Sequence, residues 1–155
     1  MQYQHTQTAP LYLILVAVGG ALLVAAWQTH EVAPRLILVC TSLLLLLLFA
    51  ASFRYLQVRD AGTDLLILFG PLPLFRRRIC YAAMERVEQS RSTMLDGWGI
   101  HLSPSGGWTW NLWGFDCVDL WYRKGARLRK IRIGTDDPVG LASFLRESMS
   151  AQGRR

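Results

Sequence analysis

Residues 36–53 read LILVCTSLLLLLLFAASF, an uncharged and almost wholly apolar run of 18 residues. A second uncharged run, the 17 residues 11–27, precedes it and reads LYLILVAVGGALLVAAW. A helix needs about 20 apolar residues to cross a bilayer, with a lower limit of about 17. A buried helix of a soluble protein is rarely apolar on every face over such a length. The sequence therefore predicts two transmembrane helices, at about residues 11–28 and 35–53.

The short segment between the two runs ends in Pro34, which suits the first turn of a helix because no backbone N–H is needed there. We therefore expect residues 11–53 to form a tight transmembrane hairpin, preceded by an N-terminal tail at residues 1–10. That tail contains no Lys or Arg, so it lacks the positively charged region of a cleaved signal peptide.

Small residues recur at every fourth position of the first predicted helix, at Ala17, Ala21 and Ala25. Small side chains at this spacing let two helices approach closely. This alanine face has two interpretations: it packs within the hairpin, or it contacts another membrane protein.

Charge is distributed unevenly along the chain. Residues 54–155 hold 16 of the 17 Lys and Arg and 10 of the 11 Asp and Glu, so they carry the whole net charge of +6. Cytoplasmic flanks of transmembrane helices are enriched in Lys and Arg. Arg54, Arg59 and the triplet at 76–78 follow the second run, whereas Arg35 alone marks the connector. We therefore expect a multi-pass protein with both termini in the cytoplasm.

Residues 54–150 are predicted to form the cytoplasmic domain, followed by a short tail at 151–155. About seven strand-like segments alternate with turn residues, and Asp96-Gly97 and Lys124-Gly125 are hairpin signals. An acidic cap followed by Pro138 starts a helix whose apolar residues share one face, namely Leu141, Phe144, Leu145 and Met149. The predicted class is α+β, with a bent antiparallel sheet or small β-barrel capped by a C-terminal helix.

Three stretches carry a resemblance to a known family. They are Phe69-Gly70-Pro71 leading to Arg78-Ile79, Gly97-Trp98-Gly99-Ile100, and Arg132 to Pro138 running into the closing helix. With the order of elements, residues 54–149 resemble the bacterial pleckstrin-homology-like (PH-like) domains that sit beside transmembrane hairpins. The resemblance implies a PH-like fold in a bacterial inner membrane and a scaffold that binds proteins, peptides or lipids without catalysis. Because the first hairpin loop, residues 60–63, is acidic and small, the resemblance does not imply phosphoinositide binding.

Two basic clusters are candidates for contact with anionic membrane lipid, since each basic residue near such a surface contributes about 1 kcal/mol. The candidate residues are Arg76, Arg77, Arg78, Arg123, Lys124, Arg127, Arg129, Lys130 and Arg132. The first cluster follows Leu72, Leu74 and Phe75, a pairing of apolar and cationic residues that suits insertion at a bilayer surface. The alternative to lipid contact is that residues 123–132 form a solvated hairpin and that the loop before residues 76–78 packs its leucines inward.

Five of the six tryptophans fall between Trp98 and Trp121. Trp108, Trp110 and Trp113 are candidate partner contacts, together with the alanine face; the alternative is that these rings belong to the core. Nucleic acid is not an expected partner.

Little in the sequence indicates catalysis. His101 is the only histidine after the hairpin, and no phosphate-binding glycine loop or nucleophile elbow is present. Asp116 and Asp119 flank Cys117, which disfavours its thiolate. The three cysteines form no CxxC motif, as expected of a reducing compartment. We therefore expect no enzyme activity, cofactor or metal.

The sequence thus predicts a non-enzymatic binding or scaffold module that contacts a membrane-protein partner, or itself, and is oriented by anionic lipid. One alternative is an accessory or assembly factor of a larger membrane complex. The other is an enzyme with an unfamiliar site.

Overall fold

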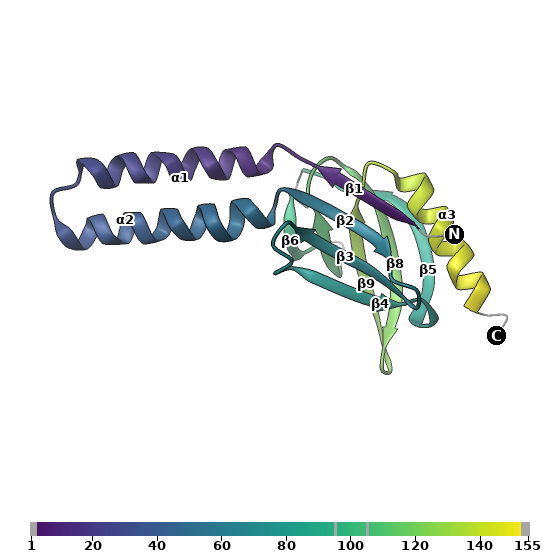
Figure 1. The fold of residues 1–155 in the computed structure, drawn as a ribbon. Helices are drawn as coiled ribbons and strands as arrows, with labels where there is room; N and C mark the ends of the chain where they lie inside the picture. The colour runs from purple at the N-terminus through teal and green to yellow at the C-terminus, as the bar shows by residue number, and fades with distance from the viewer. Residues whose placement is uncertain (1–2, 95, 105, 153–155) are drawn as a thin grey trace.

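Two antiparallel helices, α1 (Leu11–Gln28) and α2 (Val32–Leu44), form a hairpin that projects away from the rest of the molecule (Figure 1). The computed structural model describes residues 3–94, 96–104 and 106–152. The second helix begins at Val32, so Pro34 lies in its first turn as expected. Within the leucine run the helix widens to the π-helical segment η1 (Leu45–Ala50).

The two helices meet at Gly19 and Ala26, which lie two turns apart on α1. The Ser42 hydroxyl donates a 2.7 Å hydrogen bond to the Gly19 carbonyl. A Cβ atom at Gly19 would lie 2.7 Å from Leu46, so the missing side chain is what permits this approach. Ala26 is 2% exposed. Of the two interpretations of the alanine face, packing within the hairpin is therefore wrong, because Ala17 and Ala21 are exposed and Ala25 is only partly covered.

The outward faces of the hairpin are apolar. Side chains that are more than half exposed include Leu13, Ile14, Leu36, Ile37 and Leu47. Among the residues that the structure describes, the 19-residue stretch Val32–Ala50 is long and apolar enough to cross a membrane. Tyr12–Gln28 is apolar but shorter, so the length criterion supports one of the two predicted spans.

Residues 4–8, expected to belong to a tail, form strand β1 (Gln4–Thr8) instead. This strand pairs antiparallel with β2 (Tyr55–Asp60), the first strand after the hairpin, from Gln4 opposite Arg59 to Thr8 opposite Tyr55. A polar tail has little tendency of its own to form a strand. The helical hairpin brings residues 4–8 beside β2, whose unpaired edge offers backbone hydrogen bonds to them.

The other strands are β3 (Asp64–Gly70), β4 (Arg76–Cys80), β5 (Met84–Arg91), β6 (Gly99–Leu102), β7 (Trp108–Asn111), β8 (Asp116–Lys124) and β9 (Arg127–Gly134). They form two sheets with the orders β1-β2-β3-β4 and β5-β8-β9-β7-β6. The short helix η2 (Tyr81–Ala83) carries the chain from one sheet to the other.

The α+β class with mainly antiparallel sheets is as predicted, with two departures. β7 runs parallel to β9. Asp96-Gly97 does not close a hairpin, because β5 pairs with β8 and not with the following strand β6. Lys124-Gly125 does close the predicted hairpin, with Lys124 opposite Arg127.

The core lies between the two sheets and is closed by helix α3 (Pro138–Gln152). Phe69 is fully buried, and its ring centroid lies 4.9 Å from that of Phe53 and 5.8 Å from that of Trp110. Leu141 and Leu145 of α3 are also fully buried, which confirms the predicted apolar face.

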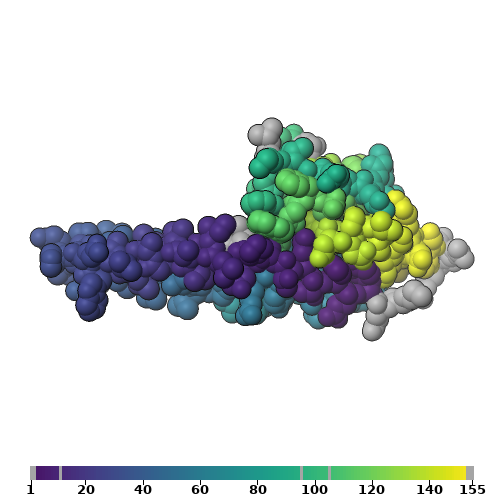
Figure 2. All heavy atoms as spheres, turned by 90° about the horizontal axis from the view of Figure 1, so that it is seen from above, coloured from purple at the N-terminus to yellow at the C-terminus, as the bar shows by residue number. Residues whose placement is uncertain are grey.

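The N-terminal strand lies against α3, as the purple and yellow surfaces of Figure 2 show. The Tyr3 ring stacks on Phe144 with centroids 5.0 Å apart, and its hydroxyl donates to Asp137 over 3.2 Å. Asp137 also accepts a 2.9 Å hydrogen bond from the backbone N–H of Gly140, which confirms the predicted helix cap. These contacts hold Tyr3 and the strand that follows it on the same side of the hairpin as the domain.

Candidate anion-binding groove

Strand β4 carries the first basic cluster along the edge of its sheet. Arg76 and Arg78 are exposed, Arg77 is half-buried and Ile79 is buried, so successive side chains alternate between the two faces. β4 stands last in its sheet, so its outer edge faces the seam between the two sheets.

The end of β8 forms the other wall of this seam. A groove of about 450 Å³ runs between them, and we call it the basic groove. It is lined by Arg76, Arg77, Arg78, Ile79, Cys80, Ala83, Tyr122, Arg123 and Lys124. Two basic clusters that are far apart in the sequence therefore meet at one site, and five of the nine predicted lipid contacts line it.

Tyr122 and Glu85 position two of these cations. The Arg77 guanidinium donates to the Tyr122 hydroxyl and lies 5.7 Å from the centroid of its ring. Arg123 pairs with Glu85, and both side chains remain partly exposed. Charge-assisted hydrogen bonds to carboxylate or phosphate are the interactions that such a set of guanidinium and ammonium groups provides. The groove is thus suited to an anionic ligand.

Arg127 and Arg129 lie outside the groove lining, on the exposed part of β9 next to the β8–β9 turn. Arg127 faces Lys124 across the turn and Arg129 faces Tyr122. In Figure 1 this hairpin extends sideways from the sheets and not back along the helical hairpin. The two arginines extend the positive surface at one end of the groove.

Arg132 and Lys130 are not available to a lipid surface, which corrects the sequence prediction. The Arg132 side chain is 9% exposed and donates to Asp119 over 2.8 and 3.1 Å and to Asp96 over 2.8 Å. Lys130 pairs with Asp119 over 2.7 Å and lies 5.2 Å from the Trp121 ring centroid. We call these four charged side chains the buried charge network.

Hydrogen bonding keeps both carboxylates of the network ionised. Burial alone disfavours the charged form of Asp119, but hydrogen bonds from Arg132, Lys130 and Ser90 outweigh it and hold its pKa below the ordinary value. The pKa of Asp96 is lowered first by a hydrogen bond from the Ser103 hydroxyl, and further by a backbone N–H and Arg132. The network therefore joins β8, β9 and the loop after β5.

The tryptophans divide between core and surface. Trp110 is 6% exposed and packs on Phe69, so its prediction as a partner contact is wrong and the core alternative holds. Trp108 is 37% exposed. Trp113 is partly covered and stacks on Trp98 with centroids 4.4 Å apart. Met94 and Phe115, which the sequence did not indicate, join Trp98 around a small apolar hollow of about 90 Å³.

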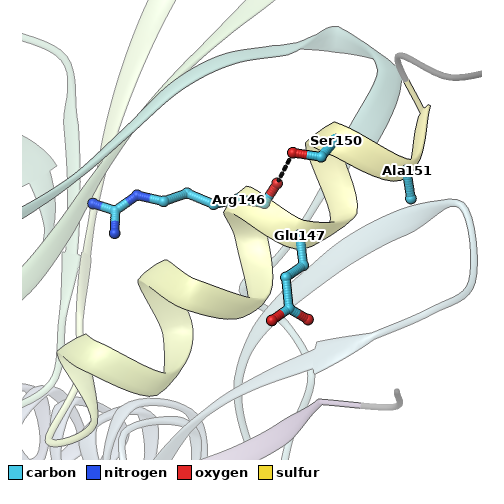
Figure 3. Close-up of a pocket in the computed structure, with 4 residues that line it drawn as sticks. All are labelled: Arg146, Glu147, Ser150 and Ala151. Carbon is cyan, nitrogen blue, oxygen red and sulfur yellow. Dashed lines mark hydrogen bonds between the residues drawn. The ribbon is translucent and has the colours of Figure 1, made fainter.

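A larger hollow of about 570 Å³ lies beside the last turns of α3, lined by Arg146, Glu147, Ser150 and Ala151. Arg146 and Glu147 point away from each other, and the hydrogen bond in Figure 3 joins Ser150 to the Arg146 carbonyl within the helix. Polar groups do not converge here, so we assign this hollow no ligand.

The structure places Cys117 where a substrate cannot reach it. Cys117 is fully buried, and burial raises the pKa of its thiol, with Asp119 acting in the same direction. Within the described ranges no three His, Cys, Asp or Glu side chains are grouped so that they would hold a metal ion.

Sequence reasoning missed the uncharged members of the groove, which are Ile79, Cys80, Ala83 and Tyr122. Arg77 and Tyr122 are 45 positions apart, and no periodicity in either strand reveals that they touch. The alternation of β8 identifies Tyr122 as an inward position, but only the pairing of sheets places it beside Arg77.

No protein-family model matches this chain, and no curated protein matches it.

Proposed function

We propose that this chain is a membrane-anchored, non-enzymatic binding module of PH-like fold, whose basic groove holds an anionic group of a membrane-protein partner. The helical hairpin would be the anchor. The observation that carries the proposal is the convergence of five cationic side chains from β4 and β8 in one groove, on a domain joined to an exposed apolar hairpin.

The hairpin supports membrane insertion by its surface. Its outer faces expose long aliphatic side chains over its whole length, whereas soluble monomers rarely expose contiguous apolar patches above a few hundred Å². The pairing of β1 with β2 supports a two-pass topology, because both ends of the hairpin then lie on one side of the bilayer. The arginine-rich flank favours the cytoplasm as that side.

Anionic lipid would orient the domain through the β3–β4 turn. Gly70, the last residue of β3, accepts a 3.2 Å hydrogen bond from Arg54, so this turn lies at the base of the hairpin. Leu72 and Leu74 in the turn are 41% and 53% exposed, and Arg76 follows directly. Exposed apolar side chains beside cations are what a bilayer surface binds.

Native cysteines offer a test of this topology. We expect the chain to stay in the membrane pellet after an alkaline carbonate wash. A membrane-impermeant maleimide should label Cys80 only after the cells are opened, because Cys80 is exposed on the domain and Cys117 is buried. Cys40 lies in the proposed span, which a membrane-impermeant reagent does not reach.

The matched control is Cys80→Ser, which should abolish the labelling without changing the carbonate result. Labelling of Cys80 in intact cells would reverse the assigned orientation. Release of the chain by carbonate would contradict the membrane anchor itself.

Partner binding is tested by purifying the tagged chain from native membranes and identifying what accompanies it by mass spectrometry. Arg76→Gln/Arg78→Gln should lose a partner that wild type retains. Arg146→Gln removes an exposed arginine from α3 and should retain it. Equal recovery with all three chains would contradict a role for the basic groove.

A second candidate function is an accessory or assembly subunit of a larger membrane complex. The observation that favours it is the exposure of Ala17 and Ala21, which packing within the hairpin does not cover. In the same purification, Ala17→Leu/Ala21→Leu should then lose the accompanying proteins, while Arg76→Gln/Arg78→Gln keeps them.

A further inference from the structure

We infer that the basic groove binds an extended acidic segment of another protein, which adds to the first sheet as a new strand beside β4. The inference rests on the proposed function and names the chemistry of the partner. It combines two observations: a free strand edge and cations on both of its sides.

The hydrogen-bond register shows which backbone groups of β4 are free for such a strand. Phe75 accepts from Phe69 over 2.9 Å, and Tyr81 donates to Thr63 over 3.1 Å, so the odd-numbered residues bond to β3. In an antiparallel pair, the backbone N–H and C=O groups of the residues in between point away from the partner strand. The N–H and C=O groups of Arg76, Arg78 and Cys80 therefore face the groove, and such groups bind added strands.

The side chains along this edge select for negative charge. Arg76 and Arg78 are exposed on one face of β4, while Arg77 projects from the other face toward Tyr122. Arg123 and Lys124 lie on the opposite wall. An incoming strand would therefore meet cations on both of its faces, and acidic side chains at successive positions would each find a partner.

A second copy of this chain does not supply such a segment. No five consecutive residues of the sequence contain more than two Asp or Glu. A lipid headgroup also matches the groove poorly. The strand runs from Arg76, opposite Leu68 near the base of the hairpin, to Cys80, opposite Asp64 at the far end of β3. Only the Arg76 end would reach the bilayer.

The charge requirement is tested with the full chain in nanodiscs of neutral phosphatidylcholine. A fluorescent peptide with Glu at successive positions, flanked by Thr, should bind, as measured by anisotropy, and its Gln-for-Glu analogue should not. Arg76→Gln/Arg78→Gln should raise the Kd about tenfold or more, as expected for lost charge-assisted hydrogen bonds. Arg146→Gln on α3 should leave the Kd unchanged.

The backbone requirement is tested at Cys80, where φ is −66°, a value that proline adopts. Cys80→Pro removes an outward N–H without changing charge, and the preceding residue Ile79 is already extended, as proline requires. We expect this variant to raise the Kd about fivefold, the equivalent of one neutral hydrogen bond. Cys80→Ala should bind the peptide as wild type does.

Failure of the inference and failure of the anchor are distinguishable. A chain that floats with liposomes but does not bind the acidic peptide overturns the inference alone. So does an unchanged Kd in Arg76→Gln/Arg78→Gln, or displacement of the peptide by phosphatidylglycerol vesicles, which would make a lipid headgroup the occupant. A chain that does not float with liposomes overturns the proposed membrane anchor.

Discussion

Arg132→Met is expected to lower the free energy of unfolding by about 3 kcal/mol, because it leaves two buried carboxylates without their shared cation. Asp96 and Asp119 are 6% and 4% exposed, and each accepts from Arg132. The loss lies at the lower end for a broken buried ion pair, since Lys130 remains 2.7 Å from Asp119. Methionine preserves most of the apolar stem, so the change is mainly electrostatic. Urea unfolding of the full chain in detergent, followed by tryptophan fluorescence, measures it.

The pH dependence of the free energy of unfolding, measured for wild type and for Arg132→Met, identifies the cause of the lost stability. The pKa values of Asp96 and Asp119 are depressed in the folded state. Their contribution to stability is therefore complete above the pKa of an unfolded Asp, about 3.9, and is lost as the pH falls through the folded-state pKa values. The stability gap between wild type and Arg132→Met should therefore shrink below about pH 4. A gap that stays constant with pH would indicate lost packing instead.

Arg91→Met is the matched control on the same sheet. Arg91 and Asp116 form an ion pair of 3.1 Å, but both side chains are more than half exposed. Exposed pairs contribute at most about 1 kcal/mol. A loss in Arg91→Met as large as that in Arg132→Met would contradict the importance of burial.

Gly107→Ala is expected to lower the free energy of unfolding by about 3 kcal/mol or more, for two reasons that add. Gly107 has φ of +87°, which costs an L-residue about 1–2 kcal/mol. A Cβ atom there would lie 2.4 Å from the backbone oxygen of Lys130, so strand β9 would have to move. That shift would disturb the pairing of Trp108 with Ile131 and the nearby buried charge network.

The neighbouring glycine separates the two reasons. Gly106 has φ of +86°, but a Cβ atom there would meet nothing within 4 Å. Gly106→Ala should therefore lose only about 1–2 kcal/mol. Equal losses in the two variants, measured by the same urea unfolding, would show that Lys130 moves aside without cost.

Local patterns predicted the elements well where one segment specifies its own structure. The apolar runs gave both helices of the hairpin, and the acidic cap with Pro138 gave the start of α3. The tail that became β1 was missed because its strand character comes from β2 and not from its own residues. The parallel pairing of β7 with β9 was missed because nothing in a short strand records the direction of its neighbour.

The candidate site was only partly predictable. Both halves of the basic groove were named from charge alone, at residues 76–78 and 123–124. The same rule wrongly included Arg132, whose charge is neutralised by carboxylates from β8 and from the loop after β5. The tryptophan cluster wrongly included Trp110 as a partner contact, since aromatic content does not reveal on which side of a strand the core lies.

The sequence by itself determined the α+β class, the apolar hairpin and the excess of positive charge after it, because these depend on composition and on short-range periodicity. Only the tertiary structure decided which cations are free and which are buried, which face of α1 packs against α2, and that β4 and β8 form one groove. Those outcomes depend on contacts between residues that are distant in the chain, and the geometry of two packed sheets sets such contacts. The alternation of a single strand does not.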